Sequence, residues 1–466
     1  MKKINIVFIS IFFLALLLPV LFFNFKADVT SEIDNRKLTN NPLIDKTVID
    51  EKGSLTDALD DYVSDRVGFR NFFIRSYTWL NDIAFNKMIH PIYEYGEDGY
   101  VFFVAQTGNK QDYDEFFDDF IKMISKINKY CQERNVPFIF AFEPSKSSVM
   151  TDKINKGINY DNSWLNAFFE RIESEGIEFV NNYDLLKEKY ESGEKVFNQK
   201  YDAGHWNDLG AFYGVNNILE SMKKHFGKLH VGVLDDFSIS NVVYDTLSVS
   251  EYSINEEGLS FSAKEDGVKD VTDVYSGEIK INNQHPYYKY WINSKNIGKS
   301  PKTLVFQGSY MNSYGYKFFL NSLSEYIAVH NYENILDFDY YFNLFKPECV
   351  VFEVTEYALS GKYFNKEIMK SFDLNPSYSN FKNYSVTNKK LNKTQLSIEK
   401  GKSITTIRVN NLPQNIDYSY IKINNIMYDL TKDNNAYTVS IPTNNYNNII
   451  VVSTVNANNH KIINYK

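Results

Sequence analysis

The spacing of apolar residues changes repeatedly between residues 112 and 225, and each change marks a different element. Residues 112–134 carry apolar side chains every three or four positions, which predicts an amphipathic helix. Residues 136–142 are almost all apolar, which predicts a buried strand. A second helix is expected at 164–172, with Asn162 and Ser163 as its N-cap. Further elements are expected at 177–180 (strand) and from 208 to about 225 (helix).

The same alternation of strand and helix returns from residue 303. Strands that alternate with helices and lack hairpin turns belong to mostly parallel sheets with helices on both faces. We therefore predict an α/β fold for this part of the chain. Residues 231–300 carry short β-prone pieces separated by Gly, Asn and Ser, and we expect them to form a β-rich insertion. The expected elements are strands at 303–306, 326–329 and 349–354 and helices near 315–323 and 340–345.

The C-terminal part of the chain, residues 376–466, follows a strand period instead. It is rich in Asn and contains alternating segments such as the one from Ser403 to Val409, which predicts a separate β-sandwich domain. Its tyrosines fit half-buried packing or stacking on sugar rings, and packing is the commoner role at strand spacing. They are Tyr418, Tyr420, Tyr428, Tyr437 and Tyr446.

An uncharged apolar segment lies near the N-terminus. Residues 4–23 come after Lys2 and Lys3 and are long enough to cross a bilayer as a helix. Positive residues before such a span favour a cytoplasmic N-terminus and export of the residues beyond the span. We therefore expect residues 1–26 to be a single-pass transmembrane anchor and residues 27–466 to be extracellular. A cleaved signal peptide is the alternative, although the apolar run is longer than usual for one.

Residues 57–85 lie between the anchor and the α/β region. Leu59, Tyr62, Val63, Val67 and the pair at 72–73 suit one face of an amphipathic helix. We expect this apolar face to pack on residues further along the chain.

Composition narrows the choice of function. The 466 residues include 50 basic and 58 acidic side chains, a net charge of −8, and no long Lys/Arg block. Since phosphate binding needs concentrated positive charge, nucleic acid is not expected as a partner. The length suits two or three domains. Cys131 and Cys349 are the only cysteines, which excludes a small disulfide-stapled scaffold.

Asp202 and His205 form the first candidate for chemistry, just before the helix expected at 208. A separation of three residues in a tight turn lets the carboxylate reach one imidazole nitrogen while the other faces a nucleophile. A structural helix cap with a hydrogen-bonded histidine is the alternative. Such a pair needs a partner elsewhere in the chain to carry chemistry.

Ser309 supplies a candidate nucleophile. The apolar strand at 303–306 is followed by Gln307, Gly308 and Ser309, and then by a helix. At such a turn the hydroxyl stands at the carboxyl end of the sheet, where open α/β sheets place their sites and where backbone N–H groups can form an oxyanion hole. N-capping of the helix by Ser309 is the structural alternative.

Together these motifs resemble the AlgJ/AlgX-like alginate O-acetyltransferases and related DHHW-motif proteins of the SGNH-hydrolase superfamily. The turn reads Gln-Gly-Ser, where many relatives carry Gly-Asp-Ser. The resemblance spans most of residues 30–360 and implies an SGNH-hydrolase-like three-layer sandwich at 27–375. Besides the two turns it rests on Asp34 to Leu38, Asp65 to Arg70, Gly96 to Phe102, Pro144 to Lys146 and Val350 to Glu356.

The resemblance implies that Ser309 is the nucleophile, His205 its general base and Asp202 the orienting carboxylate. It implies a membrane-anchored O-acetyltransferase that acetylates a cell-surface or secreted polysaccharide through a Ser-acyl intermediate, without a metal or other cofactor. The expected acetyl source is a multispanning membrane acyltransferase. An O-acetyl esterase and a noncatalytic glycan-binding or assembly protein are the alternatives. Candidate polar contacts near the site are Lys146, Asn312 and Tyr357.

Overall fold

A seven-stranded sheet lies at the centre of the computed structural model, which describes residues 2–466 apart from 32, 34, 35, 91, 109, 110, 248–251, 265, 266, 393, 394, 414 and 447–449. Asp34 and Asn35 of the motif after the anchor lie outside the described residues. The first five strands in spatial order are parallel, and the sixth runs antiparallel to both of its neighbours. The order is β6 (Glu178–Asn181), β5 (Phe138–Glu143), β13 (Cys349–Thr355), β11 (Lys302–Gln307), β12 (Glu325–His330), β10 (Tyr288–Asn293) and β9 (Val268–Asp270).

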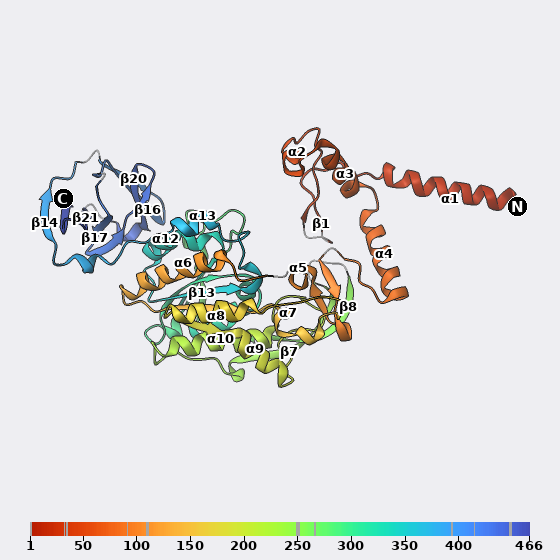
Figure 1. Cartoon of the computed structure of the whole chain (residues 1–466), viewed down its shortest axis with the longest axis horizontal. Coiled ribbons are helices and arrows are strands. Elements are labelled where there is room, and N and C mark those ends of the chain that lie inside the picture. The colour runs from red at the N-terminus through yellow and green to blue at the C-terminus, as the bar shows by residue number, and fades with distance from the viewer. Residues whose placement is uncertain are drawn as a thin grey trace.

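Helices cover both faces of this sheet, which confirms the expected three-layer α/β fold (Figure 1). Alternate residues of each strand point to opposite faces, so Phe140 and Phe352 enter one core while Ile139 and Val351 enter the other. The first face carries α6 (Glu115–Gln132), α8 (Trp164–Ser174), α12 (Phe338–Phe345) and α13 (Lys366–Ser371); the second carries α7 (Lys146–Val149), α9 (Asn182–Glu191), α10 (Asp208–Lys223) and α11 (Tyr316–Ser322).

Two local expectations require correction. Residues 231–300 are only in part an insertion: β7 (Phe237–Thr246) and β8 (Ser253–Ala263) form a separate hairpin, whereas β9 and β10 complete the edge of the central sheet. The expected N-cap at Asn162 and Ser163 is also wrong, because Ser163 has helical backbone angles and its side chain makes no capping bond. Its backbone N–H donates instead to Asp161, over 2.9 Å.

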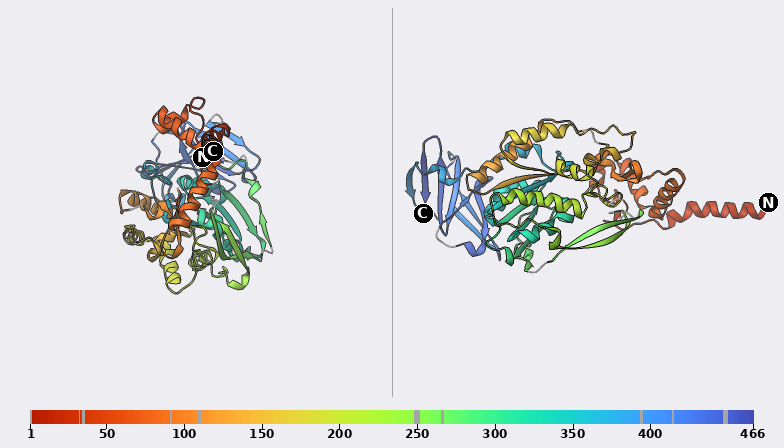
Figure 2. Two further views of the ribbon diagram at one scale, coloured as in Figure 1. Left: turned by 90° about the vertical axis from the view of Figure 1, so that its right-hand side faces the viewer. Right: turned by 90° about the horizontal axis from the view of Figure 1, so that it is seen from below.

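Helix α1 (Lys2–Leu21) projects from one end of the elongated molecule (Figures 1 and 2), and its apolar part is long enough to cross a membrane. The chain then turns through a small helical unit. Its elements are β1 (Thr30–Ser31), β2 (Arg36–Lys37), α2 (Thr47–Lys52), α3 (Leu55–Arg66) and α4 (Arg70–Phe85), followed by β3 (Tyr93–Tyr95), β4 (Val101–Phe103) and α5 (Val104–Thr107).

The helix expected at 57–85 is broken into α3 and α4. Phe69 adopts a left-handed backbone conformation, with φ of 63°, which ends the first helical run and redirects the chain. The expected packing of the apolar face is wrong for α4. Phe72, Trp79 and Leu80 are exposed.

Asp65 and Arg66 fix the segment that leaves α1. Arg66 is buried and donates to the backbone carbonyls of Thr39 (2.9 Å) and Leu38 (3.0 Å). Burial alone would raise the pKa of Asp65, but hydrogen bonds from Arg36 and Thr39 outweigh it and hold that pKa at about 2. The Asp-Arg motif therefore has a structural role in this fold.

Two further sheets form the C-terminal β-sandwich, as expected, at the opposite end from α1 (Figure 2). Tyr420 and Tyr428 are fully buried, so these two tyrosines pack in the domain and are closed to sugars. Among the described residues one sheet is β14 (Ser385–Lys389), β22 (Lys461–Tyr465), β21 (Ile450–Asn456), β17 (Tyr418–Ile423) and β18 (Ile426–Asp429); the other is β15 (Leu396–Lys400), β16 (Ile404–Asn410), β20 (Ala436–Pro442) and β19 (Thr431–Asp433).

Asp429 joins the sandwich to the α/β region. Its buried carboxylate accepts a hydrogen bond from Arg134 over 2.9 Å and another from the hydroxyl of Tyr130. Its backbone also exchanges hydrogen bonds with the Asn343 side chain. Arg134 and Tyr130 come from the last turn of α6 and the residues just after it, before β5. The sandwich therefore meets the sheet at the edge where the parallel strands begin.

Two buried carboxyl groups lie beneath the opposite edge. Glu143 ends β5 and is held by the Asn182 amide, while Glu353 on β13 accepts a hydrogen bond from the Gly308 N–H over 2.5 Å. Burial raises the pKa of both groups, that of Glu353 to about 8. Glu353 thus accepts a structural hydrogen bond, and its raised pKa favours the uncharged form.

Gly214→Ala is expected to destabilise the α/β region. A Cβ there would lie 2.2 Å from Cζ3 of Trp206, a fully buried ring that cannot move aside. Overpacking of this kind costs about 1 to 3 kcal/mol, so the melting temperature should fall. Gly227→Ala is the control, because a Cβ at Gly227 meets nothing within 4 Å. Equal melting temperatures for the two variants in calorimetry would contradict the prediction.

Glu353→Gln is expected to weaken the dependence of stability on pH. The pKa of Glu353 is raised from 4.5 to about 8 in the folded chain, so the folded state keeps a proton that the unfolded state releases. The free energy of unfolding therefore falls as the pH rises from about 4.5 to about 8. Glutamine keeps an acceptor for Gly308 but cannot ionise. Denaturant titrations across this range should show a shallower decline, and an unchanged slope would count against the assignment.

Candidate active site

Ser309 stands just beyond the carboxyl end of β11, as the sequence predicted. Gln307 is the last residue of that strand, and a single turn of π-helix (Met311–Gly315) comes next, before α11. Widened turns of this type are frequent at functional sites. The Gly308 N–H is already committed to Glu353, so it is not available to stabilise an oxyanion.

The turn that carries Asp202 and His205 has an unusual backbone. Asp202 lies in the left-handed region, with φ of 52°, which bends the chain back so that its carboxylate faces the histidine three residues later. Asn207 ends the turn, and its side chain caps α10 by accepting from the Gly210 N–H. The local sequence therefore specifies both the bend and the start of the helix.

The structure brings Asp202, His205 and Ser309 into one hydrogen-bonded chain. Asp202 Oδ1 lies 2.5 Å from Nδ1 of His205, and Nε2 of His205 lies 2.8 Å from Oγ of Ser309. The hydroxyl of Tyr357 lies 2.7 Å from the same Oγ. A hydroxyl, an imidazole and a carboxylate thus lie in the order and at the distances that serine acyl transfer requires.

Tyr310 holds the two turns together. Its buried hydroxyl donates towards the carbonyl oxygens of Gly204, inside the Asp-His turn, and Pro144, after β5. The indole N–H of Trp206 donates in return to the Tyr310 carbonyl over 3.3 Å. Tyr310, next to Ser309, and Trp206, next to His205, therefore hold each other in place.

The β7–β8 hairpin supports the approach to Asp202. The carboxylate of Glu256 on β8 accepts hydrogen bonds from the backbone N–H groups of Gln199, Lys200 and Tyr201. The ring of Tyr201 also stacks on Tyr244 of β7, with centroids 3.7 Å apart. The hairpin thus fixes the segment just before the strained turn.

His205 and Tyr314 together lower the pKa of Asp202. Burial would raise the pKa of this carboxyl, but interaction with His205 and a hydrogen bond from the Tyr314 hydroxyl, at 2.8 Å, outweigh it and leave the pKa below its ordinary value. An ionised Asp202 fixes the proton of His205 on Nδ1 and leaves Nε2 free to accept from Ser309.

A cleft of about 700 Å³ opens beside this chain. His205 and Tyr357 line it, together with the aromatic rings of Tyr160, Trp164 and Tyr363. Aromatic faces of this kind suit the apolar faces of sugar rings. The cleft is therefore a partly aromatic space beside the hydrogen-bonded chain that ends at Ser309.

The three residues predicted as polar contacts near the site, Tyr357, Lys146 and Asn312, have different positions in the structure. Tyr357 is where the sequence placed it, against Ser309. Lys146 is fully buried, and its amine donates to the carbonyls of Val101 (2.8 Å) and Gln199 (2.9 Å), so it holds loops together and does not face the cleft. Burial lowers the pKa of this amine to about 7.

Asn312 is paired with the residue that opens the nucleophile turn. The amide of Gln307 donates to its side-chain oxygen over 2.7 Å, and Gln307 itself accepts from the Tyr326 hydroxyl. The Gln of the Gln-Gly-Ser turn thus belongs to a polar network at the strand end. This network orients the Asn312 amide and explains a glutamine at a buried position.

Three residues near the site were missed by the sequence analysis: Tyr310, Tyr314 and Glu356. Glu356 lines the cleft and accepts from the Ser145 N–H (2.8 Å) and the Ser148 hydroxyl (2.5 Å), and burial raises its pKa to about 7. The two tyrosines lie one and five positions after Ser309, on the helical turn that succeeds it. That proximity is the only signal in the sequence that marks them.

Within the described part of the chain, no group of three or more His, Cys, Asp or Glu residues is arranged to hold a metal ion.

Comparison with known proteins gives one match to a family model. The family model of the SGNH hydrolase-like domain of acetyltransferase AlgX matches residues 94–232, a segment that contains Asp202 and His205 and ends before Ser309. No curated protein matches the chain.

Three solved structures are similar at low identity. PatB1 of Bacillus cereus is 15% identical, over 59% of this chain and 98% of that one, with a TM-score of 0.46. The O-acetyltransferase domain of AlgJ from Pseudomonas putida is 15% identical, over 60% and 99%, with a TM-score of 0.42. AlgX of Pseudomonas aeruginosa is 14% identical, over 74% and 86%, with a TM-score of 0.39. The resemblance inferred from the sequence is confirmed by the family model: over residues 94–232 the chain matches the SGNH hydrolase-like domain of acetyltransferase AlgX.

Proposed function

We propose that this protein is a membrane-anchored O-acetyltransferase that moves acetyl groups onto hydroxyls of a polysaccharide outside the cell. The observation that carries the proposal is the hydrogen-bonded chain from Asp202 through His205 to Ser309. Its position at the carboxyl edge of a parallel sheet is the usual place for a site in such folds. The match to an acetyltransferase domain supports acetyl as the transferred group.

In the first half-reaction Ser309 takes the acetyl group. His205 Nε2 accepts the hydroxyl proton as Oγ attacks the carbonyl carbon of the donor, and Asp202 stabilises the resulting imidazolium. The tetrahedral intermediate collapses when the bond to the leaving group breaks. The leaving group takes the proton from His205, and an acetyl ester remains on Ser309.

In the second half-reaction a sugar hydroxyl replaces the leaving group. His205 accepts its proton as the sugar oxygen attacks the acetyl carbon, and then returns that proton to Oγ as the ester to Ser309 breaks. The products are free enzyme and an acetylated sugar. The aromatic walls of the cleft hold the acceptor and limit the access of water that would otherwise hydrolyse the ester.

Tyr357 is the proposed donor to the developing oxyanion. Its hydroxyl is 2.7 Å from Oγ of Ser309 before reaction. A small shift would bring it to the carbonyl oxygen of the acetyl group, which becomes negative when Oγ attacks the carbonyl carbon. The Gly308 N–H cannot serve because it is bonded to Glu353. A hydroxyl donor therefore replaces a backbone donor in this proposal.

The proposed location is derived from α1. The apolar segment Ile4–Leu21 is preceded by two lysines, a charge pattern that keeps the N-terminus inside and exports the catalytic region. Because acetyl donors such as coenzyme A are cytoplasmic and α1 is a single span, a multispanning membrane acyltransferase is the proposed source of the acetyl group. A polysaccharide is the proposed acceptor, and nucleic acid is not among the proposed partners.

One experiment separates transfer from hydrolysis. The full chain in detergent is incubated with a chromogenic acetyl ester, with and without an oligosaccharide acceptor. An acetylated oligosaccharide detected by mass spectrometry supports the proposal. Acetate as the sole product, at a rate that the acceptor does not change, would make the protein an esterase.

Ser309→Ala is expected to abolish acetyl transfer while the chain stays folded. Loss of the nucleophile from such a triad costs roughly a thousandfold or more in turnover. Ser313→Ala is the matched control, because Ser313 is exposed in the same π-helical turn. Both variants should keep the melting temperature of the parent. Undiminished transfer by the Ser309 variant would show that the chemistry lies elsewhere.

Tyr357→Phe is expected to lower turnover and leave the binding of the acceptor intact. Removing one donor to an oxyanion costs about 10²-fold to 10³-fold in kcat. Tyr363→Phe is the control: Tyr363 also lines the cleft, and phenylalanine keeps its ring for stacking. Steady-state kinetics should show a loss in kcat without a rise in KM for the Tyr357 variant alone. A change confined to KM would make Tyr357 a substrate contact.

A further inference from the structure

Helix α4 presents its apolar side to the outside and its polar side to the protein. Thr78 is buried, and its hydroxyl donates to the Ile89 carbonyl over 2.8 Å, so this side of the helix faces the protein. Asp82 lies on the same side and accepts from the Tyr95 hydroxyl over 2.9 Å. An ordinary surface helix has the opposite orientation, with apolar residues towards the core.

The outer side of α4 is made of large apolar side chains. At 100° per residue, Phe73, Leu80 and Ile83 lie on the side opposite Thr78, and Phe72 and Trp79 lie at the border of that side, next to the groove described below. Trp79 is 62% exposed, Leu80 54% and Ile83 66%. Nothing in the described part of the chain covers this face, which we call the α4 apolar face. Burying it is worth about 25 cal/mol per Å², so leaving it in water is costly.

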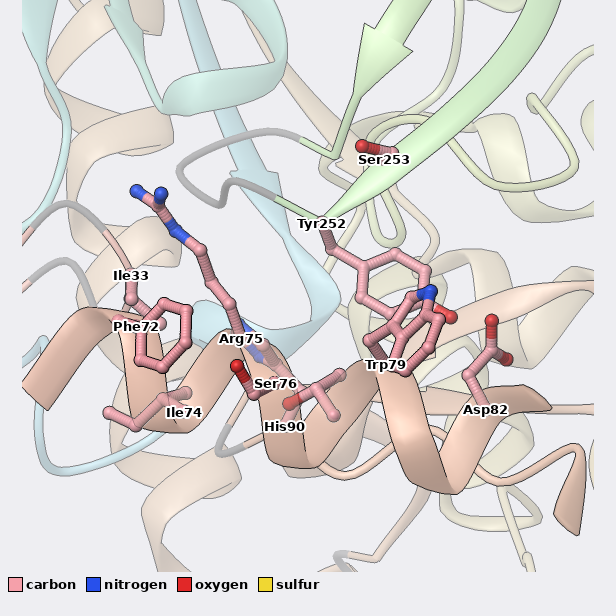
Figure 3. A pocket seen from close by; sticks show the side chains of 11 residues that line it. Ile33, Phe72, Ile74, Arg75, Ser76, Trp79, Asp82, His90, Tyr252 and Ser253 are labelled. Carbon is pink, nitrogen blue, oxygen red and sulfur yellow. The ribbon is translucent and has the colours of Figure 1, made fainter. Parts of the chain in front are cut away.

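A groove of about 390 Å³ runs beside α4, between it and the end of the β7–β8 hairpin (Figure 3). Phe72 and Trp79 line its outer border, and Tyr252 of the hairpin lies across from them. The Tyr252 hydroxyl is bonded to that of Tyr95 over 2.6 Å, and Tyr95 in turn is bonded to Asp82. The helix is therefore held to the hairpin by its polar side, with its apolar face fixed outwards.

The position of α4 is fixed relative to α1. The Gly68 N–H donates to the Pro19 carbonyl over 2.8 Å, and the rings of Phe69 and Phe22 meet edge to face with centroids 5.1 Å apart. A Cβ on Gly68 would lie 2.7 Å from the Pro19 oxygen, so glycine is required for this approach. Helix α4 thus starts beside the end of α1 and runs across its direction (Figure 1).

We propose that α4 lies in the outer surface of the lipid bilayer, with the α4 apolar face inserted among the acyl chains and its axis along the membrane plane. This inference rests on the proposed anchoring by α1. A helix that crosses the direction of a membrane span at the outer end of that span lies at the depth of the headgroups. Its apolar side chains then continue the apolar surface of α1.

The residue types agree with a lipid surface. Tryptophan and tyrosine are enriched at the membrane interface, and helices that lie in it carry large apolar residues on one face. Tyr77 and Trp79 supply the aromatic groups on this helix. A bilayer is favoured over a protein partner because the distance between α4 and the end of α1 is fixed by contacts within the chain.

Fluorescent labels on the full chain test the proposal. Leu80→Cys places a label in the centre of the α4 apolar face, and Asn71→Cys places one at an exposed position of the same helix outside that face. Both natural cysteines are buried, so the label attaches to the introduced residue. The chain is reconstituted in nanodiscs of phosphatidylcholine and phosphatidylglycerol. The label at 80 should shift its emission to the blue and be quenched by lipids that carry a nitroxide on the acyl chain, while the label at 71 should not.

A second measurement uses the natural protein. Trp79 is the only exposed tryptophan among the four, so lipids brominated on the acyl chain should quench its emission, and Trp79→Phe should remove the quenched part. Both measurements are repeated with Ser309→Ala, because lipid contact does not depend on acetyl transfer.

A third label, at Leu14→Cys, reports the insertion of α1. Quenching at position 14 without quenching at 80 would overturn the proposal for α4 and leave the anchor intact. Absence of quenching at both positions would overturn the anchor and this proposal together. Shielding of position 80 only after a second membrane protein is added would assign the face to a protein partner.

Discussion

The site depends on the hydrogen bonds of one buried group, the hydroxyl of Tyr310. It joins the carbonyl of Gly204, in the Asp-His turn, to that of Pro144, at the end of β5, and its own backbone is held by Trp206. Ser309 and His205 lie about a hundred positions apart in the sequence. The backbone segments that carry them are fixed by these bonds, so their relative position does not depend on the two side chains alone. Because Ser309 immediately precedes Tyr310, the serine inherits that rigidity.

The buried carboxyl groups at the carboxyl ends of the parallel strands differ in pKa. Asp202 stays ionised because His205 and Tyr314 offset the effect of its burial, whereas Glu353 and Glu356 have their pKa raised by burial to about 8 and about 7. Asp202, whose pKa is lowered, is the carboxyl that touches the histidine. Glu353 and Glu356 instead accept hydrogen bonds from N–H and hydroxyl groups of the surrounding loops.

The sequence predicted the sheet well, and it singled out the three side chains that the structure brings into one hydrogen-bonded chain, since buried parallel strands are continuous apolar runs and turns at their ends are short. The sequence did not predict features that depend on what surrounds a residue in the folded protein. Periodicity identified α4 as amphipathic, but it cannot tell whether the apolar face meets a protein core or lipid. Lys146 comes after a strand in the manner of a site residue, yet its amine bonds backbone carbonyls that only the folded chain brings near. Tyr314 was missed because its partner Asp202 is distant in sequence.

The β-sandwich and the site occupy opposite edges of the central sheet. Asp429 fastens the sandwich where the strands begin, and Ser309 follows the carboxyl end of β11. The parallel strand β13 points toward the half of the molecule that carries α1 (Figure 1). A chain held by α1 would thus turn its serine inward, to the bilayer, and its sandwich outward. The proposed acetyl donor would then meet the serine on the side of the molecule that carries the anchor.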